Sequence, residues 1–111
     1  MQKLIILFIS LFLVCGCSGS KTDKYKKIME ENEYVIIDVR TYSEYLEAHI
    51  KDAINIPVDE IESSISIDKN VIIFVYCRSG NRSSTARNIL RNMGYTVYDL
   101  GAFDAIDLPK E

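Results

Sequence analysis

The feature that most constrains the fold of this chain is an unbroken apolar segment, Val71-Ile72-Ile73-Phe74-Val75-Tyr76. Its hydrophobicity is continuous instead of alternating, which is typical of a strand that is covered on both faces in a parallel sheet. The segment Tyr34-Val35-Ile36-Ile37-Asp38 has the same β-branched character. The sequence therefore predicts an α/β fold with a mainly parallel sheet, helices on both faces and strand 71–76 at the centre.

The remaining segments alternate between helix and strand patterns. Apolar residues recur at helical spacing from Ala86 to Met93, and Gly94 is the expected stop of that helix. Asp23 is a candidate N-cap for the first helix. We expect that first helix to end near Asn32, short helices over 43–48 and 59–64, and strands over 53–56 and 95–100.

The composition excludes two broad classes of protein. The 111 residues are 48% hydrophobic and 26% charged, with a formal net charge of −3. A disordered chain would have lower hydrophobicity and a larger charge imbalance, and a nucleic-acid binder would carry a basic surplus. We therefore expect one ordinary globular domain that binds no nucleic acid.

The N-terminal segment has the pattern of an export signal. After Lys3, residues Leu4–Val14 are apolar apart from Ser10, which fits the apolar region of a secretory signal and is shorter than the ~20 residues that cross a bilayer. The run ends in Val14-Cys15-Gly16-Cys17, which resembles the lipobox of bacterial lipoproteins. We expect a signal peptide over 1–16, a lipidated Cys17 with a tether over 17–22, and a folded domain over 23–111, anchored to a membrane of the cell envelope outside the cytoplasm.

The loop after the central strand carries the chemistry. It reads Cys77-Arg78-Ser79-Gly80-Asn81-Arg82-Ser83, and under this processing scheme Cys77 is the one cysteine left in the folded domain. Gly80 and Asn81 both tolerate positive φ, so the loop can curl its amides inward at a helix N-terminus and form a cradle for an anion. Such a cradle lowers the pKa of a thiol, and we expect Cys77 to be largely thiolate at neutral pH.

The local charge of this region is positive although the chain is acidic. Between Lys69 and Tyr98 there are several basic residues and no Asp or Glu. Arg78 and Arg82 flank the loop and can offer forked donors to an anionic substrate. Arg87 and Arg91, at i,i+4 spacing, are interpreted as a solvated helix face.

Five motifs occur in order along the chain. They are Ile37-Asp38-Val39-Arg40, Glu44-Tyr45 leading to Ala48-His49-Ile50, Ala53-Ile54-Asn55-Ile56-Pro57, the loop from Tyr76 to Ser83, and Gly94-Tyr95 with Leu100-Gly101-Ala102-Phe103. Together they resemble the rhodanese-like domains, a family of single-domain sulfurtransferases, over about Tyr34 to Ile106. The resemblance implies that Cys77 accepts a sulfane sulfur as a persulfide, and that Arg82 helps to bind anionic donors such as thiosulfate.

The loop sequence and the family resemblance together predict a set of site residues and partners. The donor is a small sulfur compound and the acceptor a thiol or cyanide, with no cofactor, no metal and a monomeric chain. His49, the one histidine, is expected not to act as a base, because the matching residue of the family is structural. The loop residues expected to bind substrate are Arg78, Ser79, Gly80, Asn81, Arg82 and Ser83, with Asp38 and Arg40 in supporting roles at the end of a strand.

Several positions depart from the family pattern. Ala48 and Asp52 stand where the family usually has glycine, so a left-handed cap at Ala48 would be strained or replaced by another geometry. Ala102 replaces the second glycine of a turn, and Ile106 stands where many members have tryptophan. These changes affect packing and leave the nucleophile in place.

Three alternatives belong to other functional classes. A Cys-dependent phosphatase of related fold would need one residue more between its Cys and Arg than the four residues between Cys77 and Arg82. A non-catalytic rhodanese-like binding module typically has the loop cysteine replaced, and here it is present. A thiol redox protein would normally need a second nearby cysteine, and the chain has no C-x-x-C.

Overall fold

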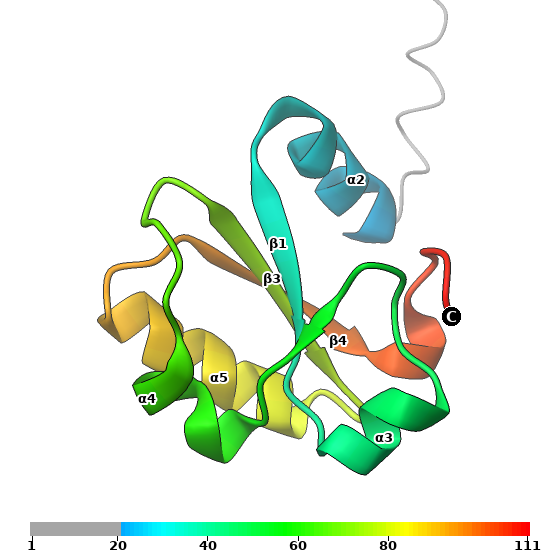
Figure 1. Cartoon of the computed structure of the whole chain (residues 1–111). Coiled ribbons are helices and arrows are strands. Elements are labelled where there is room, and N and C mark those ends of the chain that lie inside the picture. The colour runs from blue at the N-terminus through cyan, green and yellow to red at the C-terminus, as the bar shows by residue number, and fades with distance from the viewer. Residues whose placement is uncertain (1–20) are drawn as a thin grey trace, which may run out of the picture.

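A computed structural model describes residues 21–111 of the chain. The described strands form one parallel sheet in the order β2-β1-β3-β4, which confirms the predicted α/β architecture (Figure 1). Both continuous apolar segments lie in the middle of the sheet, where Ile37 of β1 is in register with Val75 of β3. The strands are β1 (Tyr34–Asp38), β2 (Ile54–Asn55), β3 (Ile72–Cys77) and β4 (Val97–Ala102).

Helices cover both faces of this sheet, as the sequence predicts. Helix α2 lies against one face and helices α4 and α5 lie against the other (Figure 1). Helix α3 lies beyond the carboxyl ends of the strands, between β1 and β2 in the chain. The helical segments are α2 (Lys21–Glu31), α3 (Tyr42–Glu47), the 3₁₀ turn η2 (Val58–Glu60), α4 (Ile61–Ser64), α5 (Asn81–Asn92) and the 3₁₀ turn η3 (Phe103–Ala105).

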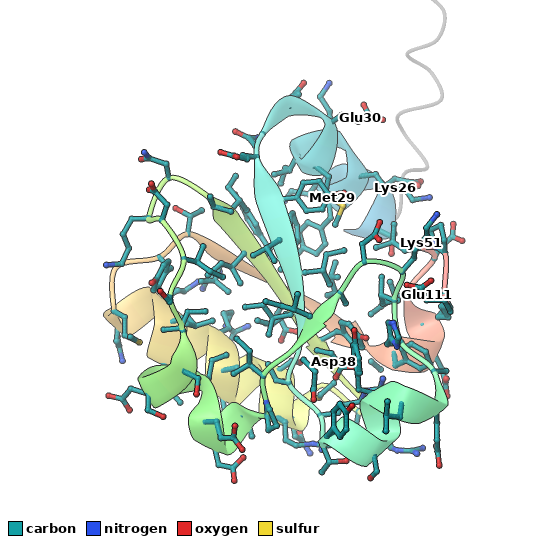
Figure 2. The ribbon with its side chains drawn as sticks, viewed as in Figure 1. Lys26, Met29, Glu30, Asp38, Lys51 and Glu111 are labelled. Atoms are coloured by element: carbon teal, nitrogen blue, oxygen red, sulfur yellow. The ribbon has the colours of Figure 1, made fainter. Side chains whose placement is uncertain are left out.

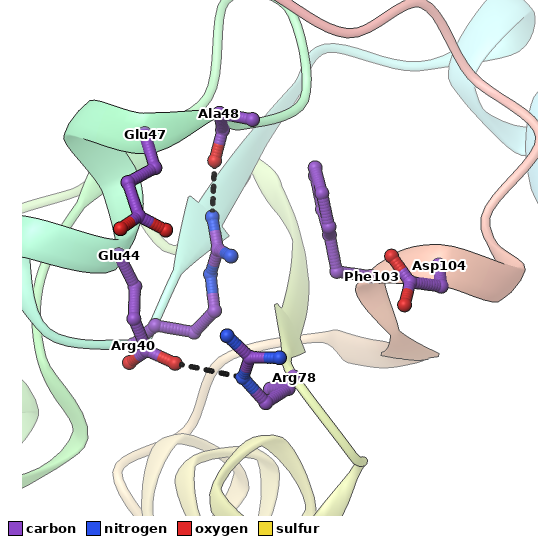
Figure 3. A pocket seen from close by; sticks show the side chains of 7 residues that line it. All are labelled: Arg40, Glu44, Glu47, Ala48, Arg78, Phe103 and Asp104. Carbon is purple, nitrogen blue, oxygen red and sulfur yellow. Dashed lines mark hydrogen bonds and ion pairs between the residues drawn. The ribbon is translucent and has the colours of Figure 1, made fainter.

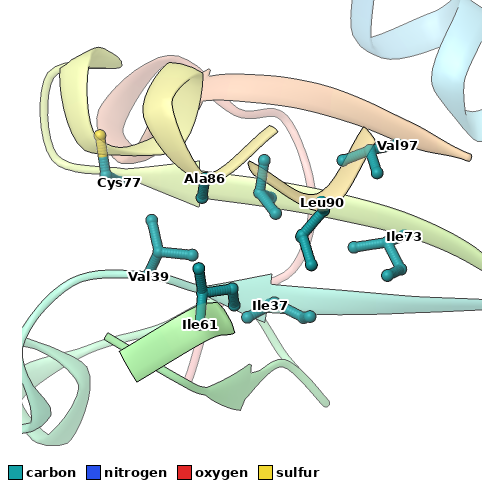
Figure 4. Close-up of a cluster of buried hydrophobic side chains, with 9 residues drawn as sticks. Ile37, Val39, Ile61, Ile73, Cys77, Ala86, Leu90 and Val97 are labelled. Atoms are coloured by element: carbon teal, nitrogen blue, oxygen red, sulfur yellow. The ribbon is translucent and has the colours of Figure 1, made fainter. Parts of the chain in front are cut away.

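Two hydrophobic clusters account for the continuous hydrophobicity of β3. Its side chains alternate, so that Ile73 (Figure 4) and Val75 pack in the cluster that contains Ala86 and Leu90 of α5, while Phe74 and Tyr76 pack in the cluster on the α2 side. Met29 of α2 lies over that second face (Figure 2). Every residue from Ile73 to Cys77 is fully buried, which explains why neither face of this strand carries a polar alternation.

Several predicted boundaries differ from the observed ones. Helix α2 as described spans Lys21–Glu31, so it includes the last two residues of the expected tether, and Asp23 lies in its first turn instead of capping it. The last strand begins at Val97 instead of residue 95, because the Tyr95 amide still donates to the Leu90 carbonyl of α5. Gly94, at φ +100°, ends that helix as predicted.

The expected signal peptide over 1–16 and the lipidated Cys17 lie outside the described residues. Within 21–111, no helix is long and apolar enough to cross a membrane.

The two positions that lack the family glycine behave differently. Ala48 ends α3 in an extended conformation at φ −171°, so the strained left-handed cap does not form there. Asp52 does adopt the left-handed region, at φ +68°. Aspartate enters this region more readily than most residues because its short side chain can bond locally, so a left-handed residue occurs here without glycine.

A buried polar network holds the carboxyl end of the sheet together. The Asp38 carboxylate accepts hydrogen bonds from Arg40 Nη2 at 2.6 Å and from the Tyr76 hydroxyl at 2.8 Å. The Tyr76 hydroxyl also accepts from the Ile50 amide at 3.0 Å, and the Asn55 side chain donates to the Asp38 carbonyl. The network thus joins β1, β3, β2 and the segment after α3 at the edge where the loop of Cys77 begins.

Replacing Tyr76 with phenylalanine should destabilise the fold by about 1–3 kcal/mol, because it strands the buried Ile50 amide and removes one donor from Asp38. Urea denaturation measures this change. Tyr42→Phe is the matched control, since Tyr42 is 62% exposed, and its effect should stay within about 0.5 kcal/mol. Equal stability of the two variants would contradict the assigned role of the network.

Candidate active site

Cys77 is the last residue of β3, and the chain then turns through Arg78, Ser79 and Gly80 into α5. Its side chain is completely buried. Gly80 is the N-cap of α5 and has φ +103°, a value that L residues with a side chain rarely adopt. A Cβ at Gly80 would meet nothing within 4 Å, so the backbone conformation and not lack of space requires glycine here.

The loop closes around the sulfur of Cys77. The Gly80 amide donates to Sγ at 3.0 Å and the Ser83 amide donates at 3.3 Å, while Ser83 Oγ lies 3.5 Å from Sγ. Ser83 is in the first turn of α5, where amides have no carbonyl partner within the helix. The sulfur therefore satisfies an end of α5 that has no side-chain cap.

These hydrogen bonds set the ionisation of the thiol. Burial by itself raises the pKa of Cys77, but a hydrogen bond with the Ser83 side chain and hydrogen bonds from the amides of Ser83, Gly80 and Ser79 outweigh it and hold the pKa below the ordinary thiol value. This direction agrees with the sequence-based expectation of an acidic thiol. Of the two loop residues that tolerate positive φ, Gly80 adopts it and Asn81 does not, because Asn81 is the first helical residue of α5.

Both loop arginines contact a carboxylate that the sequence analysis did not assign to the site. Arg82 donates to Glu44 through Nη1 at 2.8 Å and Nη2 at 3.2 Å, and Arg78 Nε donates to the same carboxylate at 3.3 Å. Glu44 belongs to α3 and is distant from the loop in sequence, so tertiary packing brings it to the two arginines. The expected cationic site is thus partly neutralised.

A small pocket of about 120 Å³ opens beside this loop (Figure 3). A pocket this size is well below the ~300–1,000 Å³ of sites for drug-sized ligands, so it suits a small molecule. The guanidinium of Arg40, which the structure places in this wall, lies 4.5 Å from the Phe103 ring centroid. The lining consists of Arg40, Glu44, Glu47, Ala48, Arg78, Phe103 and Asp104.

The other titratable residues near the sheet edge have structural partners. His49 stacks on Tyr45 with ring centroids 3.8 Å apart, its Nδ1 lies 2.9 Å from the Tyr45 carbonyl, and its Nε2 faces Glu111 at 3.5 Å. Glu111 is an orienting partner that the sequence analysis did not find, because it lies far from His49 along the chain. Throughout 21–111, no group of three His, Cys, Asp or Glu side chains could hold a metal ion.

Arg87 and Arg91 correct another expectation. They do not form a merely solvated face, since Arg91 Nη2 donates to the Val97 carbonyl at 2.7 Å and Arg87 lies 3.8 Å from Asp99. Both arginines therefore tie α5 to β4.

Comparison with known proteins places this geometry in one family. The model of the rhodanese-like domain matches residues 21–106. Thiosulfate sulfurtransferase PspE of Escherichia coli is 42% identical over 78 residues, which cover 67% of this chain and 75% of that protein. A probable molybdopterin-synthase adenylyltransferase of Porphyra purpurea is 37% identical over 95 residues, but the match covers only 25% of that longer protein.

A solved structure supports the same placement. A rhodanese with anions from E. coli superposes with a TM-score of 0.66 and 38% identity, over 70% of this chain and 96% of that chain. The fold of the chain is therefore similar to that of a solved rhodanese.

Replacing Ser83 with alanine should raise the pKa of Cys77, because it removes the hydroxyl contact and leaves the Ser83 amide in place. The thiolate fraction at neutral pH should fall accordingly. Ultraviolet absorbance of the thiolate, followed against pH, measures this change in a buried thiol. Ser84→Ala is the control on the same helix, and an equal midpoint in both variants would contradict the role given to the Ser83 hydroxyl.

Proposed function

Since this chain belongs to the rhodanese-like domain family, we propose that it is a sulfurtransferase in which Cys77 carries the transferred sulfur. The observation that carries the proposal is the buried Cys77 Sγ, which accepts amide hydrogen bonds from Gly80 and Ser83 at the start of a helix. A thiol held in this way stays ionised and is available as a nucleophile, because the amides stabilise the thiolate anion in a site that excludes water.

The reaction consists of two sulfur transfers. The Cys77 thiolate attacks the sulfane sulfur of a donor such as thiosulfate, the S–S bond of the donor breaks, and sulfite leaves with the bonding electron pair. The product is a persulfide on Cys77. A thiol or cyanide acceptor then attacks the outer sulfur, and the Cys77 thiolate leaves unchanged. The sulfur is passed on without an external oxidant or reductant, so the cycle needs no cofactor.

The loop backbone is suited to a single sulfur atom. Asn81 and Arg82 are also in the first turn of α5, and their amides have no carbonyl partner within the helix. We expect these amides to stabilise the charge on the outer sulfur of the persulfide, which is the function of preorganised donors in many active sites. Arg78, Ser79 and Gly80 complete the loop, with Asp38 and Arg40 supporting it from β1.

The phosphatase alternative fits this loop less well. A phosphoryl group presents several oxygens that must all accept hydrogen bonds. Here two loop amides, those of Gly80 and Ser83, are already used by Sγ itself, and the loop is one residue shorter than the phosphatase pattern. The binding-module alternative leaves unexplained why an acidic thiol is retained.

We also propose that the domain is anchored to the cell envelope through Cys17. The support is the apolar run Leu4–Val14 and the small residue that precedes Cys17. Helix α2 includes Lys21, which is a few residues beyond Cys17 in the sequence, so a lipid on Cys17 would hold the domain close to the membrane surface.

Thiosulfate should add the mass of one sulfur atom to the protein, and cyanide should remove it with release of thiocyanate. Cys77→Ser should abolish both steps, because its hydroxyl is not ionised and cannot form a persulfide. Intact mass spectrometry and a thiocyanate assay measure the two steps, and Ser84→Ala serves as a folded control that should stay active. Aryl-phosphatase turnover that depends on Cys77, without persulfide from any sulfane donor, would refute the proposal.

Expression of the full chain in a bacterium should yield a membrane-associated protein that starts at an acylated Cys17. Cys17→Ser should remove the acyl chains and release the protein from the membrane fraction, whereas Cys77→Ser should leave the anchoring intact. Fractionation and intact mass measure both variants. Wild-type protein that retains residues 1–16 or carries no acyl chain would rule out the anchor.

A further inference from the structure

Glu44 is the point at which helix α3 and the Cys77 loop meet. Its carboxylate accepts two hydrogen bonds from Arg82 and one from Arg78, and its side chain is only 19% exposed. The Arg82 contact is a forked pair, with one nitrogen on each carboxylate oxygen. One carboxylate therefore neutralises part of the charge of both guanidinium groups that flank Cys77.

The Glu44 carboxylate is also fixed from its own side. Glu44 is the third residue of α3 and forms a capping box with Thr41, in which the Thr41 amide and hydroxyl donate to Glu44 Oε1 at 3.0 and 3.1 Å. Hydrogen bonds from Arg82, opposed by burial and aided by Thr41, hold the pKa of Glu44 far below its usual value. An incoming anion therefore meets a carboxylate that neither swings away readily nor becomes protonated at physiological pH.

The charges around the loop mouth are correspondingly balanced. Arg40, which lines the pocket together with Arg78, is paired with Asp38 at 2.6 Å. Two further acidic side chains, Glu47 and Asp104, line the same pocket. A donor with two negative charges thus finds less attraction than the local sequence from Lys69 to Tyr98 implies.

We propose that Glu44 is a specificity-determining residue, which holds Arg78 and Arg82 and so disfavours dianionic sulfane donors relative to singly charged ones. The inference rests on the proposed sulfurtransferase function and concerns the class of donor. A singly charged donor is an alkyl persulfide anion, whose outer sulfur passes to the Cys77 thiolate while the alkyl thiolate leaves with the S–S bonding pair.

The physical reason lies in how Coulomb energy scales. The Coulomb energy between a donor and the arginine charge that is released when Glu44 is neutralised is proportional to the donor's own charge. The logarithm of the rise in kcat/KM should therefore be about twice as large for a dianion as for a monoanion. Neutralising Glu44 should therefore raise kcat/KM for both donors, and it should raise it more for thiosulfate than for a persulfide anion.

The test is Glu44→Gln, assayed with thiosulfate and with an alkyl persulfide. Glutamine is accepted at the third position of a capping box, so α3 should stay folded. We expect kcat/KM to rise about tenfold for thiosulfate and about threefold for the persulfide. The rise should come from a lower KM and not from a higher kcat. A mere loosening of the loop would instead lower kcat for both donors.

Glu47→Gln is the matched control. It removes the same unit charge from the same helix and the same pocket wall, and no side chain in residues 21–111 pairs with Glu47, so no arginine is released. Its effect measures the general consequence of charge removal. The ratio of the two donors should shift clearly more in Glu44→Gln than in Glu47→Gln, and an equal shift would refute the inference.

Two outcomes separate this inference from the proposed function. If wild-type protein forms no Cys77 persulfide with either donor, the sulfurtransferase assignment fails. If the wild type is active and Glu44→Gln leaves the donor ratio unchanged, or weakens thiosulfate, only the inference fails.

The wild-type protein provides a second measurement that does not depend on how the variant folds. With the arginines held by Glu44, the KM for thiosulfate should change less than about twofold between low and physiological salt, because little free charge is left to screen. A steep rise with salt would indicate unneutralised arginines and would contradict the inference.

Discussion

The buried ion pair of Asp38 and Arg40 is the interaction on which the functional edge of this domain depends. Both side chains are almost fully buried, and removing one partner of such a pair leaves an uncompensated charge in the interior. The pair also receives the Tyr76 hydroxyl, and Arg40 continues to the Ala48 carbonyl and the Phe103 ring. It therefore fixes the strand ends, the segment after α3 and one wall of the pocket relative to one another.

The sulfur of Cys77 has two roles, because it completes the start of α5 and is also the acidic thiol of the site. Helix α5 begins with a left-handed glycine and has no side-chain cap, and the Ser83 amide of its first turn donates to Sγ. The same contacts that complete the start of the helix lower the pKa of the thiol. Because the cap is strongest when the sulfur is charged, the fold favours the thiolate that sulfur transfer requires.

The electrostatics of the loop depend on an element remote in the chain. Viewed along the sequence, Arg78 and Arg82 stand in a segment without acidic residues, and a strongly cationic mouth is the natural interpretation. In the fold, Glu44 reaches them across 34 and 38 residues of sequence. Glu44, which forms the capping box at the start of α3, thereby also reduces the positive charge that a donor meets at the loop.

The sequence alone determined the features that arise from local pattern. The continuous apolar runs specified β1 and β3 because only a doubly covered strand can bury both faces, Gly94 specified the end of α5, and the loop of Cys77 was recognisable from its residue types. The tertiary structure decided the Asp38–Tyr76 contact, the left-handed Asp52, the helical Asn81 and the pairing of Glu44 with both arginines. These depend on which distant segments pack together, and no periodicity or local propensity encodes a contact between side chains that meet only after the sheet has formed.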